Sequence, residues 1–237
     1  MADKPLGKPL GFKSYGSIGH LPGSRLGPGD HTVHEGQARI CLQKTRDARD
    51  KIFVTEKLDG SNVGVALKDG QLLALSRAGY LATTSPYEMH HLFAHWVRLE
   101  TERFRACLQE GERLVGEWLA LAHGTLYDLK HEPFVVFDMF AGQKRYAYDE
   151  LRRRCEAGLF VHPHLIHEGA LGLERLEALL QTSGHGALDG PEGAVYRVER
   201  DGQVDFLAKY VRACKEAGCY LNRPDRPCED RWLWRPL

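Results

Sequence analysis

Short runs in which apolar and polar residues alternate dominate the chain after residue 50. Residues 51–57 (KIFVTEK), 62–67 (NVGVAL) and 72–77 (LLALSR) are rich in β-branched and other apolar side chains, which favours strands. The first two are joined by a tight turn, and the Asp-Gly step in 68–71 (KDGQ) predicts a hairpin turn into the last one, giving a third antiparallel strand. A strand, an Asp-Gly turn and a second strand recur at 192–211 (EGAVYRVE, RDGQ, VDFLAKYV).

Helical periodicity is confined to two segments. Residues 87–109 place apolar side chains at helical spacing, which predicts one long amphipathic helix, and 171–183 predicts a second, shorter one. Further short apolar runs at 113–121 (RLVGEWLAL) and 133–140 (PFVVFDMF) are typical of strands. This order of elements indicates an α+β fold of antiparallel sheets flanked by helices.

The length of 237 residues and a 43% hydrophobic content are enough for one generous domain. Residues 1–50 are rich in Gly and Pro, which predicts ordered loop rather than helix or strand. We therefore expect a single domain over 1–237, with a loop-rich segment at 1–50, a core at 51–212 and a tail at 213–237. The tail alternates basic and aromatic residues, which suits either a surface that stacks on nucleic acid or a segment packed back on the core.

Composition narrows the class of protein. The formal net charge of zero argues against a protein that coats nucleic acid indiscriminately, although it leaves room for a local basic groove. No apolar run approaches the roughly 18 residues of a membrane span, and the N-terminus lacks the apolar stretch of a secretory signal, so we expect a cytoplasmic protein with no membrane partner. Its six scattered cysteines are expected to be free thiols.

One short motif points to chemistry. In EKLDGSN at 56–62, Lys57 leaves a predicted strand and enters an Asp-Gly turn, where its amine would be held rigidly. A Lys-x-Asp-Gly match arises by chance in about one chain in twenty-five of this length, so a plain surface turn is the alternative. The motif carries weight only through the segments that follow it.

Those segments, taken with Lys-x-Asp-Gly, resemble the covalent nucleotidyltransferase superfamily of ATP-dependent DNA ligases, RNA ligases and mRNA capping enzymes. Five segments resemble further motifs of that superfamily in the same order: SRAG at 76–79, GEWL at 116–119, VFDMF at 136–140, EGAVYR at 192–197 and LAKYV at 207–211. Glu-Lys-x-Asp-Gly-x-Asn together with Phe-Asp-x-Phe looks most like the RNA-ligase branch. The resemblance implies a nucleotidyltransferase (adenylation) domain, and no OB-fold domain is recognisable.

The resemblance also implies a reaction. Lys57 would attack the α-phosphorus of ATP, AMP would pass to an RNA 5′-phosphate, and a 3′-hydroxyl would displace it. Each matching residue acquires an implied contact: the purine for Glu56, the reacting phosphates for Asn62, the ribose or the 3′-hydroxyl end for Arg77, the ribose hydroxyls for Glu117, the adenine face for Phe137, Mg²⁺ or Mn²⁺ for Glu192 and the α-phosphate for Lys209. Alternatives are a core role for Phe137, an exposed turn for Asn62, a surface ion pair for Arg77 and a solvent-facing Glu192.

Elementary chemistry supports this assignment. A lysine with an ordinary pKa near 10.4 is protonated at neutral pH and cannot attack phosphorus, so its surroundings must favour the neutral amine. Strand alternation directs Glu56 to the face opposite Lys57. Cations must surround the phosphates, which suits Lys209 and a divalent metal held by carboxylates.

The sequence departs from its relatives at one position. Leu207 occupies the place where the RNA-ligase strand often has a first lysine, in Lys-x-Lys. Arg212, or Arg25 from the Gly-rich loop, is a candidate replacement. Fewer than thirty residues follow the last motif, so a clamp for the strand ends would have to come from 1–50, the tail, a second subunit or a partner protein. Competing hypotheses are a minimal DNA nick ligase and a protein that binds nucleotides or RNA ends without ligating them.

Three other groups of residues contain side chains that commonly bind metals. His91 and His95 lie at i and i+4 of the predicted long helix, and residues 162–167 hold three more histidines, yet no third ligand or carboxylate is evident. Cys214, Cys219 and Cys228 lack a Cys-x-x-Cys pair. A partly buried helix is the simpler explanation of His91 and His95, and whether the other histidines or the three cysteines bind a metal stays open.

Overall fold

The computed structural model describes residues 7–235 and contains two five-stranded sheets. The first sheet has the strand order β1-β10-β9-β2-β8, with bounds β1 Gly19–His20, β10 Gln203–Val211, β9 Gly193–Arg200, β2 Asp50–Lys57 and β8 Leu165–Glu168. The second has the order β4-β3-β5-β6-β7, with bounds β4 Gln71–Ser76, β3 Ser61–Lys68, β5 Glu112–Trp118, β6 Phe134–Ala141 and β7 Lys144–Arg145. Apart from the parallel β1–β10 pair, the ladders are antiparallel. The α+β expectation is confirmed.

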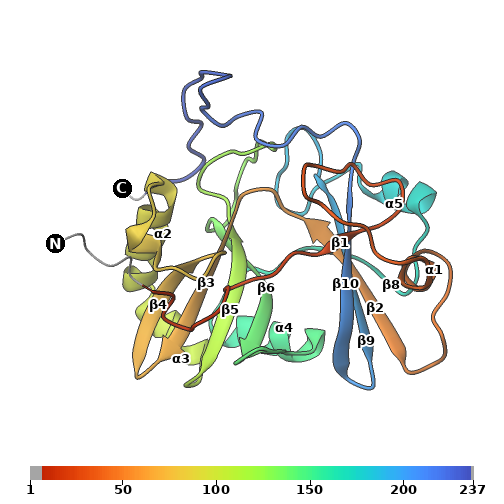
Figure 1. The fold of residues 1–237 in the computed structure, drawn as a ribbon, viewed down its shortest axis with the longest axis horizontal. Helices are drawn as coiled ribbons and strands as arrows, with labels where there is room; N and C mark the ends of the chain where they lie inside the picture. Colours follow the sequence, from red (N-terminus) through yellow and green to blue (C-terminus); the bar gives the residue numbers. More distant parts are fainter. Residues whose placement is uncertain (1–6, 236–237) are drawn as a thin grey trace.

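Figure 1 shows the two sheets side by side, with α2 and α3 on the side of the second sheet, α1 and α5 on the side of the first, and α4 near the lower centre of the view. The helices and the one 3₁₀ turn in residues 7–235 are α1 Glu35–Leu42, the turn Ala82–Thr84, α2 Glu88–Leu99, α3 Thr101–Cys107, α4 Tyr148–Ala157 and α5 Leu173–Leu179. None of these helices is both long and apolar enough to span a bilayer. The strands β2 and β3 flank the Lys57 turn but belong to different sheets, so the chain passes from one sheet to the other at this turn.

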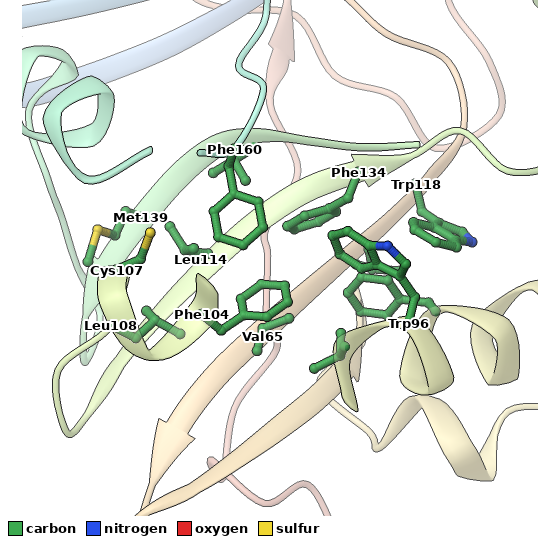
Figure 2. Close-up of a cluster of buried hydrophobic side chains, with 14 of the residues drawn as sticks. Val65, Trp96, Phe104, Cys107, Leu108, Leu114, Trp118, Phe134, Met139 and Phe160 are labelled. Atoms are coloured by element: carbon green, nitrogen blue, oxygen red, sulfur yellow. The ribbon is translucent and has the colours of Figure 1, made fainter. Parts of the chain in front are cut away.

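Each sheet has its own hydrophobic core. The second sheet packs against α2 and α3 through an aromatic cluster that includes Trp96, Phe104, Trp118, Phe134 and Phe160 (Figure 2). Most of its ring pairs have tilted or edge-to-face geometries, such as Trp96 and Phe104 at 5.7 Å between centroids, while Phe93 and Trp96 are stacked. Truncating one such ring to alanine costs about 3–5 kcal/mol. The first sheet packs a separate cluster against α1 and α5.

Both expected helices depart from their predicted bounds. The single helix expected over 87–109 is wrong: it divides at Glu100 into α2 and α3. The hydroxyl of Thr101 donates to the carbonyl oxygen of Arg98 at 2.9 Å, so a side chain competes with the helical ladder at the break. The helix expected over 171–183 is shorter, and residues 183–185 form a loop.

Residues 1–50 are not loop throughout. Within the described part, α1 and β1 lie in this segment, and α1 buries Ala38 and Cys41 against the first sheet. Helix α4 was not predicted from the sequence. Its ten residues are mostly charged, yet it buries Tyr148, Leu151 and Cys155. The tail packs back on the core: the backbone of Leu233 bonds to Ala120 at 2.8 Å, and Trp234 packs edge-on against Trp118.

Candidate functional site

Lys57 ends β2 and faces the space between the sheets. Its Nζ donates hydrogen bonds to the Glu192 carboxylate and to the carbonyl oxygen of Leu58, the latter at 3.2 Å. The Lys57 and Glu192 side chains are only 21% and 15% exposed. Glu192 directly precedes β9, and Lys57 pairs with Gly193 in the ladder, so antiparallel pairing brings residues 135 positions apart into contact.

The turn after Lys57 is fastened on both sides. The Asp59 carboxylate accepts from the backbone N–H of Gly124 at 2.7 Å, and its own backbone N–H donates to the Tyr127 hydroxyl at 2.9 Å. A Cβ on Gly60 would lie 2.6 Å from the carbonyl oxygen of Trp118, so only glycine fits there. The Asp-Gly of the motif therefore fixes the crossing between the sheets.

The facing strands of the second sheet supply three further residues. Asn62 on β3 pairs with Glu117 on β5, and Glu117 accepts from the backbone N–H of Gly60 at 3.0 Å. The Asn62 side-chain oxygen is buried and has no partner among the described residues. Phe137 is the extra residue of a bulge in the β5–β6 ladder, because Val115 pairs with Asp138 while Gly116 pairs with Val136. Bulges commonly re-aim a side chain beside a functional site.

These residues surround one cavity of about 870 Å³ between the sheets. Seven of the eight residues selected from the sequence line it, namely Glu56, Lys57, Asn62, Arg77, Glu117, Phe137 and Lys209, and Glu192 adjoins it through its bond to Lys57. Neither Arg25 nor Arg212 is part of the lining. Arg212 instead donates to Glu177 on α5 at 3.1 Å. The eight residues are thus brought together, while these two proposed substitutes are not.

The charged side chains around the cavity shift one another's pKa values. Burial acts to lower the pKa of Lys57, but the carboxylates of Glu192, Glu117 and Asp59 outweigh it and leave that pKa raised. Burial raises the pKa of Glu192, and that of Glu117 to about 7. Burial and the nearby Lys57 ammonium lower the pKa of Lys209. In the free protein Lys57 is therefore held as an ammonium by the carboxylates.

Glu56 points away from Lys57, as strand alternation predicts. Its carboxylate accepts from the Ser183 hydroxyl and from the backbone N–H of Gly184, the latter at 2.8 Å, and the residue is 2% exposed. The predicted contact with a purine is not tested by these bonds. Both carboxylate oxygens of Glu56 therefore accept hydrogen bonds from the 183–185 loop.

Lys209 and Leu207 differ in their surroundings. Lys209 lies 3.5 Å from Asp30, which also contacts His20 at 3.1 Å, so the N-terminal segment contacts Lys209 through Asp30 rather than Arg25. Leu207 packs in a small apolar cluster with Tyr15 and Phe137. The position where related strands often carry lysine is therefore apolar here.

Arg77 lies at the exposed rim of the cavity, where its guanidinium donates to the carbonyl oxygen of Gly16 at 3.1 Å. No surface ion pair holds it among the residues described. Its side chain is thus anchored to the N-terminal segment, which covers part of the cavity.

Two histidines of the cavity wall escaped the sequence analysis. His90 sits between the hydroxyls of Ser85 and Ser61 at 2.6 and 2.8 Å. The Nε2 atom of His123 is buried without a partner in the described structure, and burial lowers the pKa of this imidazole to about 4. Sequence spacing singled out His91 and His95, which lie at i and i+4 of a predicted helix. No feature of the local sequence identifies the neighbouring His90 as a residue of the cavity wall.

No group of three metal-ligating side chains occurs in residues 7–235. His91 bonds to the carbonyl of Ser85 and His95 to Arg98. A Mg²⁺ site built from one or two carboxylates, phosphates and water needs no such group. The carboxylates of Glu192 and Glu117 and the unpartnered oxygen of Asn62 supply the hard oxygen donors that this ion prefers, so these residues fit it.

The fold and the strand-end lysine beside its carboxylates define a nucleotidyltransferase domain of the ligase type. A family model described as RNA ligase matches residues 50–211, more than half of the chain. The protein therefore belongs to the RNA ligase family.

Solved structures agree with this fold. A Naegleria gruberi RNA ligase variant solved with ATP and Mn is 19% identical, with a TM-score of 0.53, covering 84% of this chain and 60% of that one. The N. gruberi RNA ligase solved with PPi is also 19% identical, with a TM-score of 0.51, covering 88% of this chain and 61% of that one. An Aquifex aeolicus protein described provisionally as an ATP-dependent DNA ligase is 19% identical, with a TM-score of 0.50 and coverages of 83% and 49%. The chain thus spans less than two thirds of each. No curated protein sequence matches it.

Proposed function

We propose that the protein is an ATP-dependent RNA ligase that carries AMP on Lys57, transfers it to an RNA 5′-phosphate and seals this end to a 3′-hydroxyl. The observation that supports this most is the Lys57 amine, bonded to Glu192 and facing a cavity that Asn62, Glu117 and Lys209 also line. Membership of the RNA ligase family supports the same reaction.

In the first step, a bond forms between Nζ of Lys57 and the α-phosphorus of ATP, and the bond to the departing pyrophosphate breaks. Nζ must first lose a proton. Glu192 is its hydrogen-bond partner, and burial raises the pKa of this carboxyl, so Glu192 is suited to receive that proton. Lys209 contributes positive charge beside the α-phosphate as charge develops there.

A divalent metal belongs to this proposal as well. Mg²⁺ or Mn²⁺, when bound, would neutralise phosphate charge, with Glu192, Glu117 and Asn62 as the oxygen donors of this chain. The N. gruberi variant mentioned above was solved with ATP and Mn, which supports the same pairing of nucleotide and metal.

The test of the first step is incubation with ATP labelled at the α-phosphate and a divalent metal. We expect label to remain on the denatured protein and to be lost in Lys57→Ala. Lys51, 68% exposed on the same strand, provides the matched control, because Lys51→Ala should label normally. Absence of label on the unaltered protein would refute the proposal.

The strand that accepts AMP is the second question. Adenylylated protein supplied with nicked RNA, single-stranded RNA or nicked DNA should discharge AMP fastest onto RNA ends. The likeness to the A. aeolicus protein makes a DNA nick ligase the second candidate, and faster discharge onto nicked DNA would favour it. Stable label without discharge onto any strand would favour a protein that has lost ligation. We also propose a cytoplasmic location, and a clamp for the strand ends supplied by residues 1–50, the tail, a second subunit or a partner protein.

A further inference from the structure

Three histidines from distant parts of the chain meet behind the strand that carries Lys57. His131 precedes β6, His164 precedes β8, and His185 lies between α5 and β9. Nδ1 of His185 lies 3.0 Å from Nε2 of His131, and the two rings meet edge-on with centroids 5.0 Å apart. Nε2 of His185 lies 3.1 Å from the backbone nitrogen of His164. His185 is 5% exposed, whereas His131 is half-buried and His164 is exposed, so the array runs from the surface to a buried ring.

The hydrogen bonds fix the proton positions on both rings. A backbone N–H can only donate, so Nε2 of His185 accepts and its Nδ1 carries the hydrogen. That hydrogen is donated to Nε2 of His131, which leaves Nδ1 of His131 to donate to the carbonyl oxygen of Glu132 at 2.6 Å. The chain of bonds therefore requires both imidazoles to be neutral.

Two routes lead from His185 to Glu56. The backbone N–H of His185 donates to the Ser183 hydroxyl at 3.0 Å, and Ser183 and Gly184 both donate to the Glu56 carboxylate. The second route runs through His164, whose carbonyl oxygen accepts from the backbone N–H of Glu56 at 2.9 Å. Both the side chain and the backbone of the residue before Lys57 are thus tied to this array.

The loop is seated closely enough to transmit such a constraint. A Cβ on Gly184 would lie 2.5 Å from Cβ of His164, and one on Gly186 would lie 2.4 Å from the carbonyl oxygen of Asp128. Gly186 also has a positive φ of 76°, which favours glycine. Little space remains for the loop to shift independently of its neighbours.

We propose that His131 and His185 are positioning residues for Lys57: they hold the 183–185 loop, the loop holds Glu56, and Glu56 fixes the end of β2 from which Lys57 reaches the cavity. The inference rests on the proposed function of Lys57. None of the three histidines lines the cavity, so replacing one of them removes no side chain that could touch the nucleotide, although Glu56, which the array holds, does line it. A displaced nucleophile slows the chemical step more than it weakens binding.

The test compares two substitutions of His131. Glutamine can present an acceptor where Nε2 lies, whereas leucine has a similar size and no acceptor. At saturating ATP we expect His131→Leu to slow the formation of lysyl-AMP by about tenfold or more, with KM for ATP changed less than about twofold. His131→Gln should restore most of the rate. His95→Leu, at an exposed histidine on α2, is the matched control.

The outcomes separate this inference from the proposed function. Equal labelling rates for His131→Leu and His131→Gln, or a rise in KM without a fall in rate, would overturn the positioning role while Lys57 still labels in the unaltered protein. Absence of label on the unaltered protein would instead overturn the proposed function. Circular dichroism and the melting temperature identify a variant that fails to fold, in which case Ser183→Ala, compared with Ser183→Thr, tests the same route.

Discussion

At the scale of single residues, the environment of Lys57 is the opposite of what its chemistry finally needs. Attack on phosphorus requires a neutral amine, yet three carboxylates raise the pKa of Lys57 above its ordinary value despite burial. The free protein therefore holds its nucleophile protonated and inactive.

Replacing Glu192 by glutamine should lower the pKa of Lys57, because burial would then be opposed by fewer carboxylates. The expected result is that Lys57 reacts with an amine-selective acylating reagent at lower pH in Glu192→Gln than in the unaltered protein. Mass spectrometry of the modified peptides across a pH series measures this. The exposed Lys51 is an internal control, and an unchanged pH midpoint for Lys57 would contradict the electrostatic explanation.

The seven cavity-lining residues that were selected from the sequence were predictable, since each belongs to an ordered motif. Their partners were not. Asp59 is bound by Gly124, and Glu56 by Ser183 and Gly184, and no local pattern announces a bond between residues so far apart in the chain. His90 and His123 carry no recognisable spacing, so only the fold reveals them.

At the scale of elements, strands were predicted better than helices. Alternation and Asp-Gly turns are local signals, and the hairpins β3–β4 and β9–β10 form as they indicate. Helix limits depend on single side-chain bonds such as that of Thr101, and α4 is too polar to display a clear apolar stripe. The expectation that 51–57 and the two strands after it form consecutive antiparallel neighbours is wrong, because β2 and β3 separate into different sheets at a turn that local sequence cannot orient.

Strand β10 offers a direct test of the departure at Leu207. Leu207 lies opposite Arg197 in the β9–β10 ladder and packs with Tyr15 and Phe137. A lysine there would place an ammonium among apolar rings and beside a guanidinium, so Leu207→Lys should destabilise the protein by about 1–3 kcal/mol without speeding lysyl-AMP formation. Thermal melting and labelling rates measure both effects.

Leu207→Met is the matched control, since a volume-conserving apolar exchange costs less than about 1.5 kcal/mol. Faster labelling of Leu207→Lys would show that the missing cation limits the reaction. In that case the apolar cluster would be a defect of the site rather than part of its construction.

At the scale of the whole molecule, function is concentrated where the sheets face each other and stability where each sheet meets its helices. The helix-facing sides hold the two large apolar clusters. The facing sides carry Lys57, Lys209, Glu117 and Arg197, so charged groups are gathered around one cavity although the formal net charge is zero. Charged groups gathered in this way are partly desolvated, which lowers the free energy of unfolding of the protein.

This cost should be visible in the pH dependence of unfolding. Burial raises the pKa of Glu117 to about 7 from an ordinary 4.5, so the folded protein binds a proton between these values that the unfolded chain does not, and stability falls as pH rises through this window. Burial lowers the pKa of His185 to about 3 from 6.5, so its contribution has the opposite sign: stability is lost as pH falls from 6.5 toward 3. The Glu117 and His185 contributions to the free energy of unfolding therefore offset each other between about pH 6.5 and 4.5.

Glu117→Gln keeps an acceptor for the backbone N–H of Gly60 but removes the ionisable carboxyl. The variant therefore lacks the Glu117 contribution to the pH dependence of stability. We expect the variant to be more stable than the unaltered protein at pH 8, by up to about 3 kcal/mol, since one pKa unit corresponds to about 1.36 kcal/mol. That advantage should disappear near pH 4.5, so the variant loses stability more steeply on acidification. Urea unfolding at pH 8, 6 and 4.5 measures the difference, and parallel profiles for the two proteins would show that the Glu117 carboxyl is not strained by burial. A gain in stability together with lost lysyl-AMP formation would mean that the site holds this carboxylate desolvated at the expense of the fold.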